Sequence, residues 1–372
     1  KKLMVKNYYL LLGFCTFFVF VKLTAIYTTN FNLYGDEAQY WLWSKNIAFG
    51  YFSKPPLLPW LIRFVCSLAG NSFFVLKLIP IILYCITSYF IFIFSKKLWG
   101  DRLLAIYCAL TFFLLPSVSL SSFLLSTDIL LILFWTLGLI QLLNINDNPS
   151  KLNFIYLGLI LGFAFLSKYA ALYFIISLIV FLIVEKNFKI KFFQSKLNLF
   201  FFTLAILFVI LPNILWNYQN SWITLEHTAE NASLNNVKLN YLGLLSFLLS
   251  QLIMIGPILF IGFFYYFSKN SIITTSEKLL LSFGLPALLI VMVESFLVRA
   301  HANWAAVSLV SLSILFVGKI YRFNKKIIDI NNYLNLTVGV ILFIMIGASF
   351  PLVIFDRIKG VKDFVHFLDK KN

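Results

Sequence analysis

The sequence predicts an all-α polytopic membrane protein, a bundle of about eleven transmembrane helices with short interfacial helices in its first external loop. Of the 372 residues, 61% are hydrophobic and only 12% are charged, and the mean hydropathy is +0.92. Apolar runs of the roughly 20 residues that cross a bilayer recur from end to end. No hydrophilic stretch is as long as an ordinary soluble domain. We therefore interpret residues 1–372 as one integral-membrane domain, with no separate soluble carboxy-terminal domain.

The formal net charge of +16 does not indicate nucleic-acid binding. The lysines lie in short clusters between apolar runs, where they act as topology signals and contact anionic lipid. The expected partners are therefore membrane lipids and not nucleic acid. The four cysteines show no paired spacing, so neither a disulfide framework nor a zinc motif is predicted.

The predicted spans begin with residues 8–27. Basic residues precede this run, as in a signal peptide, but no small-residue cleavage site follows it, so it is interpreted as a retained signal anchor. The remaining predicted spans are 74–95, 103–120, 128–144, 152–167, 169–184, 198–216, 240–267, 279–298, 303–318 and 333–355.

The lysines and arginines between spans predict how the chain is threaded. Clusters at 96–102, 186–196 and 319–326 fall on the same side as the amino terminus. The positive-inside rule then places that side in the cytoplasm and the loop containing Asp36 outside. With eleven spans, the basic tail from Asp356 to Asn372 would also lie outside, so either the count is off by one or this tail is an exception.

Residues 152–184 form one apolar block that is interrupted only at Ser167, Lys168 and Tyr169. A continuous helix of that length would measure about 50 Å, whereas the hydrocarbon core is about 30 Å thick. Two short spans that meet at Lys168 near the outer face resolve the difference. The Lys168 side chain then either points into a polar cavity or snorkels to the interface.

The first external loop, 28–73, is expected to hold two amphipathic helices on the membrane surface. A helix from Asp36 to about Ile47 places Asp36, Tyr40 and Trp43 on one face. Tyrosine and tryptophan favour the membrane–water boundary, so this helix should lie flat. A solvated surface loop is the alternative, although an aromatic belt alone would not explain the adjacent carboxylates.

A second short helix is predicted after Gly50, with Ser53 resembling its N-cap and two prolines near its start. Together the two helices would hold Asp36, Glu37 and Lys54 toward the mouth of the bundle. Charges beside a membrane are costly to desolvate, so this group is a candidate functional site.

The other external loops add further polar residues on the same side. Asp128 begins the fourth span, where it is either a site carboxylate or only a helix N-cap. His227 follows the seventh span, and Arg299, His301 and Asn303 precede the tenth. A carboxylate that removes a proton from a hydroxyl and a cation that stabilises a departing phosphate would suit such a cluster.

Several of these segments, in order along the chain, resemble the bacterial family 39 glycosyltransferases, a group similar to the protein O-mannosyltransferases and to the aminoarabinose transferase that acts on lipid A. The matching segments are 36–45, 50–56, 126–128, 166–169, 212–219 and 301–306. The resemblance implies a GT-C fold with its active site at the extracytoplasmic membrane surface. It also implies transfer of a sugar, with inversion, from a polyprenyl-phosphate donor.

The resemblance also implies roles for individual residues. Asp36 would be the catalytic carboxylate, and Glu37 would support it or help to place the acceptor. Lys54 would bind the lipid phosphate, and Lys168, His301 and Asn303 would line the donor pocket. Tyr40 is also predicted to bind the donor, and Arg299 is added to this group because of its charge and position. The predicted substrate-binding residues are Asp128, His301, Asn303, Trp43 and His227.

Many relatives carry a further external domain that this chain does not show, which favours a lipid-linked glycan or lipid A core over a protein as acceptor. No metal or other cofactor is expected to be required, although Asp36, Glu37 and Asp128 together could hold a divalent cation weakly. The expected location is the bacterial cytoplasmic (inner) membrane. The alternatives are a transporter or flippase for lipid-linked saccharides, which would be expected to show inverted repeats, and a structural membrane subunit.

Overall fold

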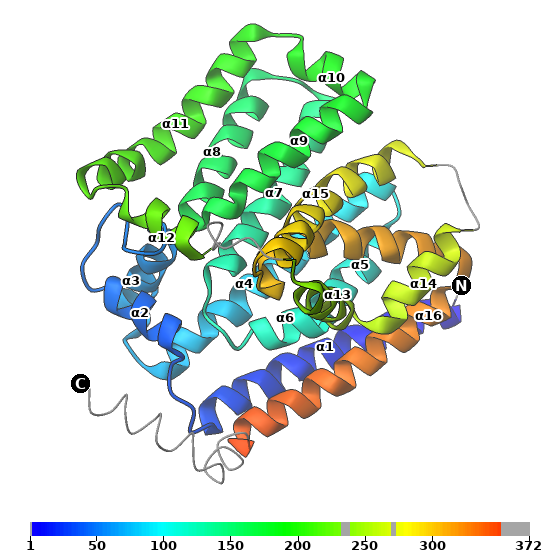
Figure 1. Ribbon diagram of the computed structural model, residues 1–372. Coiled ribbons are helices and arrows are strands. Elements are labelled where there is room, and N and C mark those ends of the chain that lie inside the picture. Colours follow the sequence, from blue (N-terminus) through cyan, green and yellow to red (C-terminus); the bar gives the residue numbers. More distant parts are fainter. Residues whose placement is uncertain (1, 232–238, 269–272, 351–372) are drawn as a thin grey trace.

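The computed structural model describes residues 2–231, 239–268 and 273–350, and over these residues the protein is a helical bundle without strands (Figure 1). Six helices in these ranges are long and apolar enough to cross a membrane, and two bent helix pairs bring the number to eight. This count stands against about eleven predicted spans. The difference arises because several predicted spans are short, broken or fused.

The first half of the bundle follows the predicted order. It contains α1 (Lys2–Thr28), α4 (Phe73–Trp99), α5 (Arg102–Leu114), α6 (Pro116–Ser121), α7 (Thr127–Asp147), α8 (Lys151–Ser167) and α9 (Leu172–Val184). The predicted span 103–120 is wrong as one helix, because Leu115 is extended (φ −52°, ψ 139°) before Pro116. A residue before proline is disfavoured from helical conformation.

The second half departs further from the prediction. It contains α10 (Lys186–Phe193), α11 (Lys196–Gln219), α12 (Ile223–Asn231), α13 (Tyr241–Ile255), α14 (Pro257–Phe267), α15 (Thr275–Leu297) and α16 (Ser308–Gly347). The predicted span 240–267 is instead α13 and α14, bent by 96° at Gly256, whose φ of +95° suits glycine. The predicted spans 303–318 and 333–355 are joined between Ser308 and Gly347 in α16, which has one non-helical residue, Asn324.

The first external loop forms two helices, as predicted, with different limits. Helix α2 (Gly35–Trp43) ends before Ile47, and α3 (Leu57–Ala69) begins after Pro56. The predicted N-cap role of Ser53 is wrong, because α3 has no side-chain cap at its first turn. The side chains of residues 2–10 lie outside what the structure describes, as do residues 351–372, which include the end of the last predicted span and the basic tail.

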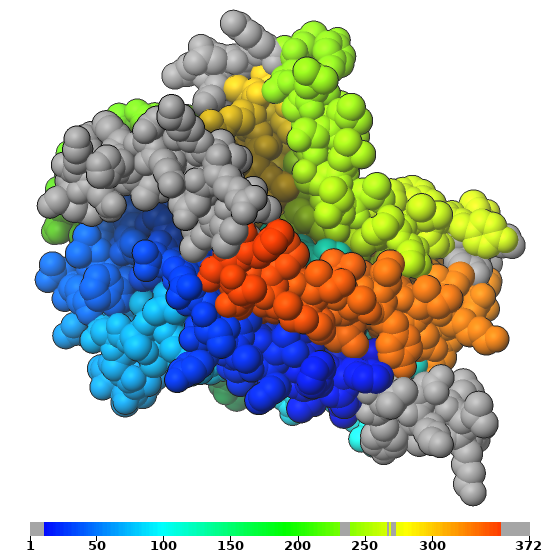
Figure 2. Space-filling view, turned by 90° about the horizontal axis from the view of Figure 1, so that it is seen from below, coloured from blue at the N-terminus to red at the C-terminus, as the bar shows by residue number. Residues whose placement is uncertain are grey.

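Helix packing brings the loops that were predicted to be external to one end of the bundle. Helix α8 packs between α7 and α11, and α16 contacts α1, α5, α14 and α15. Gly158 and Gly162, one turn apart on α8, allow close approach to Phe202, Ala205 and Val209 of α11. Helices α2, α3 and α12 gather at one end in Figure 1, and the amino terminus and α10 lie toward the other. Figure 2 shows α1 beside the second half of α16.

Candidate active site

A cavity of about 690 Å³ opens among α2, the loop before α3, and the ends of α7, α8, α9 and α15. The start of α7, the end of α8 and the short 3₁₀ turn Tyr169–Ala171 meet there because the chain reverses between neighbouring spans. The volume falls within the roughly 300–1,000 Å³ of small-molecule sites. Seven of the site residues predicted from the sequence line this cavity: Asp36, Tyr40, Lys54, Asp128, Lys168, His301 and Asn303.

Asp36 lies in the first turn of α2 and lines the cavity with an exposed side chain. Among the described residues, no hydrogen bond or ion pair engages its carboxylate. Tyr40, one turn later, is 3% exposed and also lines the cavity. The helix therefore presents Asp36 to the cavity while Tyr40 anchors the same face. Of the three residues predicted on one face of this helix, Asp36 and Tyr40 line the cavity and Trp43 does not.

Lys54 is held by an ordered loop and not by contacts of its own ammonium group. The Asn213 side chain of α11 donates a hydrogen bond to the Phe49 carbonyl at 2.6 Å, and Thr224 of α12 donates one to the Tyr51 carbonyl at 2.6 Å. Gly50 permits this packing, because a Cβ there would collide with the Trp216 ring. The loop thus carries Lys54 to the cavity wall with its ammonium group available to a ligand.

The pKa of Lys54 is lowered from the ordinary lysine value of 10.5, mainly by burial and also by the nearby positive charge of Lys168, while Asp36 and Asp128 oppose the change. Burial penalises the charged form of an amine. An anionic ligand beside Lys54 would restore the charged form, so the position suits a phosphate.

Asp128 joins three elements around the cavity. Its Oδ1 accepts a hydrogen bond from Lys168 Nζ at 2.6 Å, and its Oδ2 accepts one from the Asn303 amide at 2.9 Å. The N-cap of α7 is Ser126, so the alternative of Asp128 as a helix cap is wrong. Lys168 faces the cavity, as one of its two predicted alternatives required, and does not snorkel away.

His301 and Arg299 lie at the rim beside the 3₁₀ turn Ala302–Ala305. Burial, with Arg299 and Lys168 nearby, lowers the pKa of His301 from 6.5. Arg299 Nη2 lies 3.1 Å from His301 Nε2, and since a guanidinium group only donates, the neutral imidazole accepts. His301 lines the cavity, whereas Arg299 is exposed and does not.

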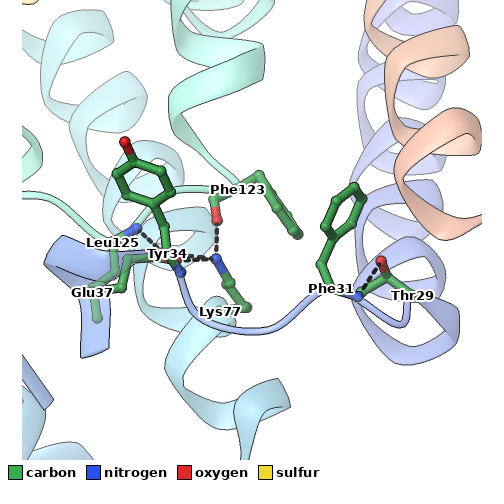
Figure 3. A network of polar contacts seen from close by, with 7 residues as sticks. All are labelled: Thr29, Phe31, Tyr34, Glu37, Lys77, Phe123 and Leu125. Atoms are coloured by element: carbon green, nitrogen blue, oxygen red, sulfur yellow. Dashed lines mark hydrogen bonds and ion pairs between the residues drawn. The ribbon is translucent and has the colours of Figure 1, made fainter. Parts of the chain in front are cut away.

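Glu37 occupies a different place from the one predicted beside Asp36. It is 1% exposed and does not line the cavity. Figure 3 shows its carboxylate accepting from Lys77 Nζ at 2.6 and 2.7 Å, from the Leu125 amide at 2.6 Å and from the Tyr34 amide at 2.8 Å. Both carboxylate oxygens of Glu37 therefore have all their hydrogen bonds inside the protein. The expectation that Glu37 faces the site together with Asp36 is wrong, and Glu37 instead holds α2 in place.

Lys77 was not identified from the sequence, although it is the partner that makes this arrangement possible. It lies in the apolar helix α4, is 0% exposed, and also donates to the Phe123 carbonyl at 3.0 Å. A lone charge inside an apolar run is a signal that could have found it. Glu294, in the last turn of α15, lines the cavity and was also not identified. It too is a lone charge inside an apolar run.

Two predicted substrate-binding residues lie outside the cavity wall. Trp43 stacks on Tyr51 with ring centres 5.0 Å apart, which supports the loop that carries Lys54. His227 packs its ring against Phe52 at 4.7 Å. Both therefore contribute to the frame of the site and not to its lining.

The three carboxylates considered for a weak cation site do not converge. In the described part of the chain, no group of three or more His, Cys, Asp or Glu side chains gathers as a metal site would require. Glu37 and Asp128 are already paired with lysines, which leaves Asp36 alone.

Comparison with known proteins shows similarity to membrane glycosyltransferases. The profile of the family described as dolichyl-phosphate-mannose-protein mannosyltransferase matches residues 53–216, which include Lys54, Asp128 and Lys168. The lipid A galacturonosyltransferase RgtD of Rhizobium johnstonii is 29% identical over 289 residues, which are 77% of this chain and 60% of that protein.

Two solved structures share the fold. ArnT from Cupriavidus metallidurans, bound to undecaprenyl phosphate, aligns with a TM-score of 0.68 at 14% identity over 88% of this chain and 62% of its own. The oligosaccharyltransferase of Archaeoglobus fulgidus, in complex with zinc and sulfate, aligns at 0.51 with 13% identity over 89% of this chain and 52% of its own. The chain thus spans about three fifths of the length of RgtD and ArnT.

The helical fold shared with ArnT confirms the predicted fold class, a polytopic membrane bundle of the GT-C type. Within that class, the resemblance to membrane glycosyltransferases drawn from the sequence is confirmed by the family profile and by RgtD.

Proposed function

We propose that this protein is an inverting glycosyltransferase that moves a sugar from a polyprenyl-phosphate donor to a lipid-linked glycan or lipid A core. One observation carries the proposal: Asp36 and Lys54 face the same cavity, and neither side-chain charge has a hydrogen-bonding or ion-pair partner among the described residues. An available base and an available cation in one site suit attack by a hydroxyl and departure of a phosphate. The similarity to RgtD and to ArnT with its bound carrier supports this choice.

In the proposed reaction, Asp36 accepts the proton of the acceptor hydroxyl. The acceptor oxygen then forms a bond to the anomeric carbon of the donor, on the face opposite the phosphate. The bond between that carbon and the phosphate oxygen breaks, and its electron pair leaves with the polyprenyl phosphate. Lys54 stabilises the added negative charge, with the Lys168 ammonium nearby.

The Asp128, Lys168 and Asn303 contacts serve this reaction by keeping the cavity open. They link the start of α7, the end of α8 and the turn before α16 across one wall. Fixed polar groups in a partly water-excluded site need no reorganisation when charge develops. Tyr40, which also lines the cavity, would contact the donor from α2.

The reaction would take place at the extracytoplasmic face of the bacterial cytoplasmic membrane. The site lies where helix ends meet interfacial helices, a depth at which a lipid phosphate lies while its chain stays in the apolar layer. The lysine clusters at 96–102 and 186–196 occur at the other ends of the spans. The cluster at 319–326 lies in the middle of α16, where Lys319 Nζ is 2.8 Å from Glu277 in the first turn of α15. Under the positive-inside rule this is the cytoplasmic arrangement.

The test is transfer of label from polyprenyl-phosphate sugars to lipid in a bacterial lipid extract, with the purified chain in detergent. We expect a labelled lipid product and release of the carrier phosphate. Asp147→Asn is a matched control, since Asp147 ends α7 outside this cavity. A flippase would instead move intact donor across vesicles without consuming it, and that result would replace the proposal.

Lys54, and not a divalent cation, is proposed to balance the phosphate charge, because two of the three candidate carboxylates already pair with lysines. Transfer should therefore continue after treatment with EDTA, at no less than about half its rate. A loss of more than about ten-fold, restored by Mg²⁺ or Mn²⁺, would show that a cation supplies charge that Lys54 does not.

A further inference from the structure

Glu294 is a cavity residue for which the proposed reaction has no use. It lies in the last turn of α15, its side chain is partly buried, and it lines the same cavity as Asp36 and Lys54. Within the described ranges, its carboxylate makes no hydrogen bond or ion pair. A carboxylate that loses water without gaining donors is unfavourable, so a ligand that supplies donors would bind well there.

Two aromatic residues line the cavity with Glu294, and both rest on a firm base. Tyr173 of α9 and Trp304 of the 3₁₀ turn pack against a small buried cluster of Phe247, Val291 and Ala305. The His301 ring meets Trp304 edge-on at 5.3 Å. Aromatic rings with a polar edge offer large, rigid contact area to a ring that is apolar on its faces and polar at its rim.

This group lies apart from the phosphate-binding end of the cavity. Glu294 lies on α15, which packs on α9 and on the 3₁₀ turn that carry Tyr173 and Trp304, whereas Lys54 lies in the loop before α3. A donor whose phosphate contacts Lys54 and whose sugar ring extends across the cavity would bring that ring to Glu294.

We propose that Glu294, Tyr173 and Trp304 form the subsite for the donor's sugar ring and select a ring that carries hydroxyl or ammonium donors and no carboxylate. This inference rests on the proposed function. The carboxylate of Glu294 accepts hydrogen bonds from the ring edge, and it repels the carboxylate of a uronic acid in a partly desolvated site. The chain would then differ in donor sugar from RgtD, which is a galacturonosyltransferase.

The test compares binding of three ligands to the purified full chain: undecaprenyl phosphate alone, the same carrier with a neutral hexose, and the same carrier with a uronic acid. The wild-type protein should bind the hexose donor about ten-fold more tightly than the uronic acid donor, as a charge-assisted hydrogen bond would give. Glu294→Gln keeps the shape and removes the charge, so the ratio should fall to about one. Binding of the bare carrier should not change in this variant.

Glu226→Gln is the matched control, because Glu226 lies on α12, which reaches the same cavity at Thr228, and does not itself line the cavity. It should leave all three affinities unchanged. Tighter binding of the uronic acid donor by the wild-type protein, or an unchanged ratio in Glu294→Gln, would overturn the subsite and leave the proposed function standing. Failure of the wild-type protein to bind even the bare carrier would overturn the proposed function itself.

Discussion

Two lysine–carboxylate pairs of this protein have nearly equal lengths and different surroundings. Glu37 and Lys77 are 2.6 Å apart with side chains 1% exposed, and amides and a carbonyl complete their hydrogen bonds. Asp128 and Lys168 are also 2.6 Å apart, but they line the cavity at 13% and 17% exposure. The first pair is closed and holds the structure together, whereas the second remains open to a ligand.

The same contrast separates two neighbours in the sequence. Successive helical residues point about 100° apart. Asp36 therefore faces the cavity while Glu37 faces the interior, where Lys77 neutralises it. Substitutions on the two sides should then divide cleanly into effects on rate and effects on stability.

The largest effect is expected from Asp36→Asn. Loss of a general base lowers the rate of transfer on the order of 10²–10⁴-fold. Because the Asp36 side chain is exposed and has no partner in the described structure, thermal unfolding should not change. Single-turnover transfer and a melting curve of the same preparation measure both. A variant that transfers sugar at the wild-type rate would remove Asp36 from the mechanism.

Lys77→Met should act in the opposite way and destabilise the fold. It leaves the Glu37 carboxylate buried without a cation, which typically costs about 3–5 kcal/mol. The free energy of unfolding in detergent measures this loss. The double replacement Glu37→Met with Lys77→Met removes both charges and should recover much of it. If Lys77→Met unfolds like the wild type, the pair does not anchor α2.

The sequence was sufficient for the polar residues at the ends of apolar runs and insufficient for those inside them. Asp36, Lys54, Asp128 and Lys168 stand out because they are polar residues at the ends of apolar runs, and the structure brings all four to one cavity. Lys77 and Glu294 lie inside apolar runs, and they were therefore counted as single charged residues within predicted spans. That Glu37 turns inward depends on where α4 and the loop after α6 come to lie, and no local pattern reports this.

The helix limits show a similar division. The breaks at Gly256–Pro257 and before Pro116 could have been read from residues that punctuate helices. The continuity of α16 could not, since its middle is polar. Asn331 and Asn332 there are buried by tertiary packing, and the Asn331 amide donates to the Asn332 side-chain oxygen at 3.3 Å. Long apolar helices were thus predicted well, and their breaks and fusions were not.

A smaller effect is expected at Lys54, and it should depend on pH. Only the charged ammonium attracts phosphate, and burial lowers its pKa below 10.5. Donor affinity should therefore fall as the pH rises from neutral toward 10.5, with a midpoint below that value. Lys54→Arg stays charged and should flatten the profile, because arginine does not titrate in this range. A profile that is the same in both proteins would separate Lys54 from the phosphate.

The smallest effect is expected from the open pair, because a ligand or water can replace part of what a substitution removes. In a double-mutant cycle of Asp128→Asn and Lys168→Met, we expect a coupling energy of about 0.5–2 kcal/mol for donor binding. Stability should change less than in Lys77→Met, since both side chains reach the cavity. Isothermal titration with undecaprenyl phosphate supplies the four affinities.

Asn303→Ala is a matched control for this cycle. The Asn303 amide donates to Asp128 Oδ2, so its removal leaves the Asp128–Lys168 pair in place. A coupling energy of about 3–5 kcal/mol, as large as the loss of stability expected for Lys77→Met, would mean that the Asp128–Lys168 pair is as closed as the Glu37–Lys77 pair. The distinction between a closed and an open pair would then fail.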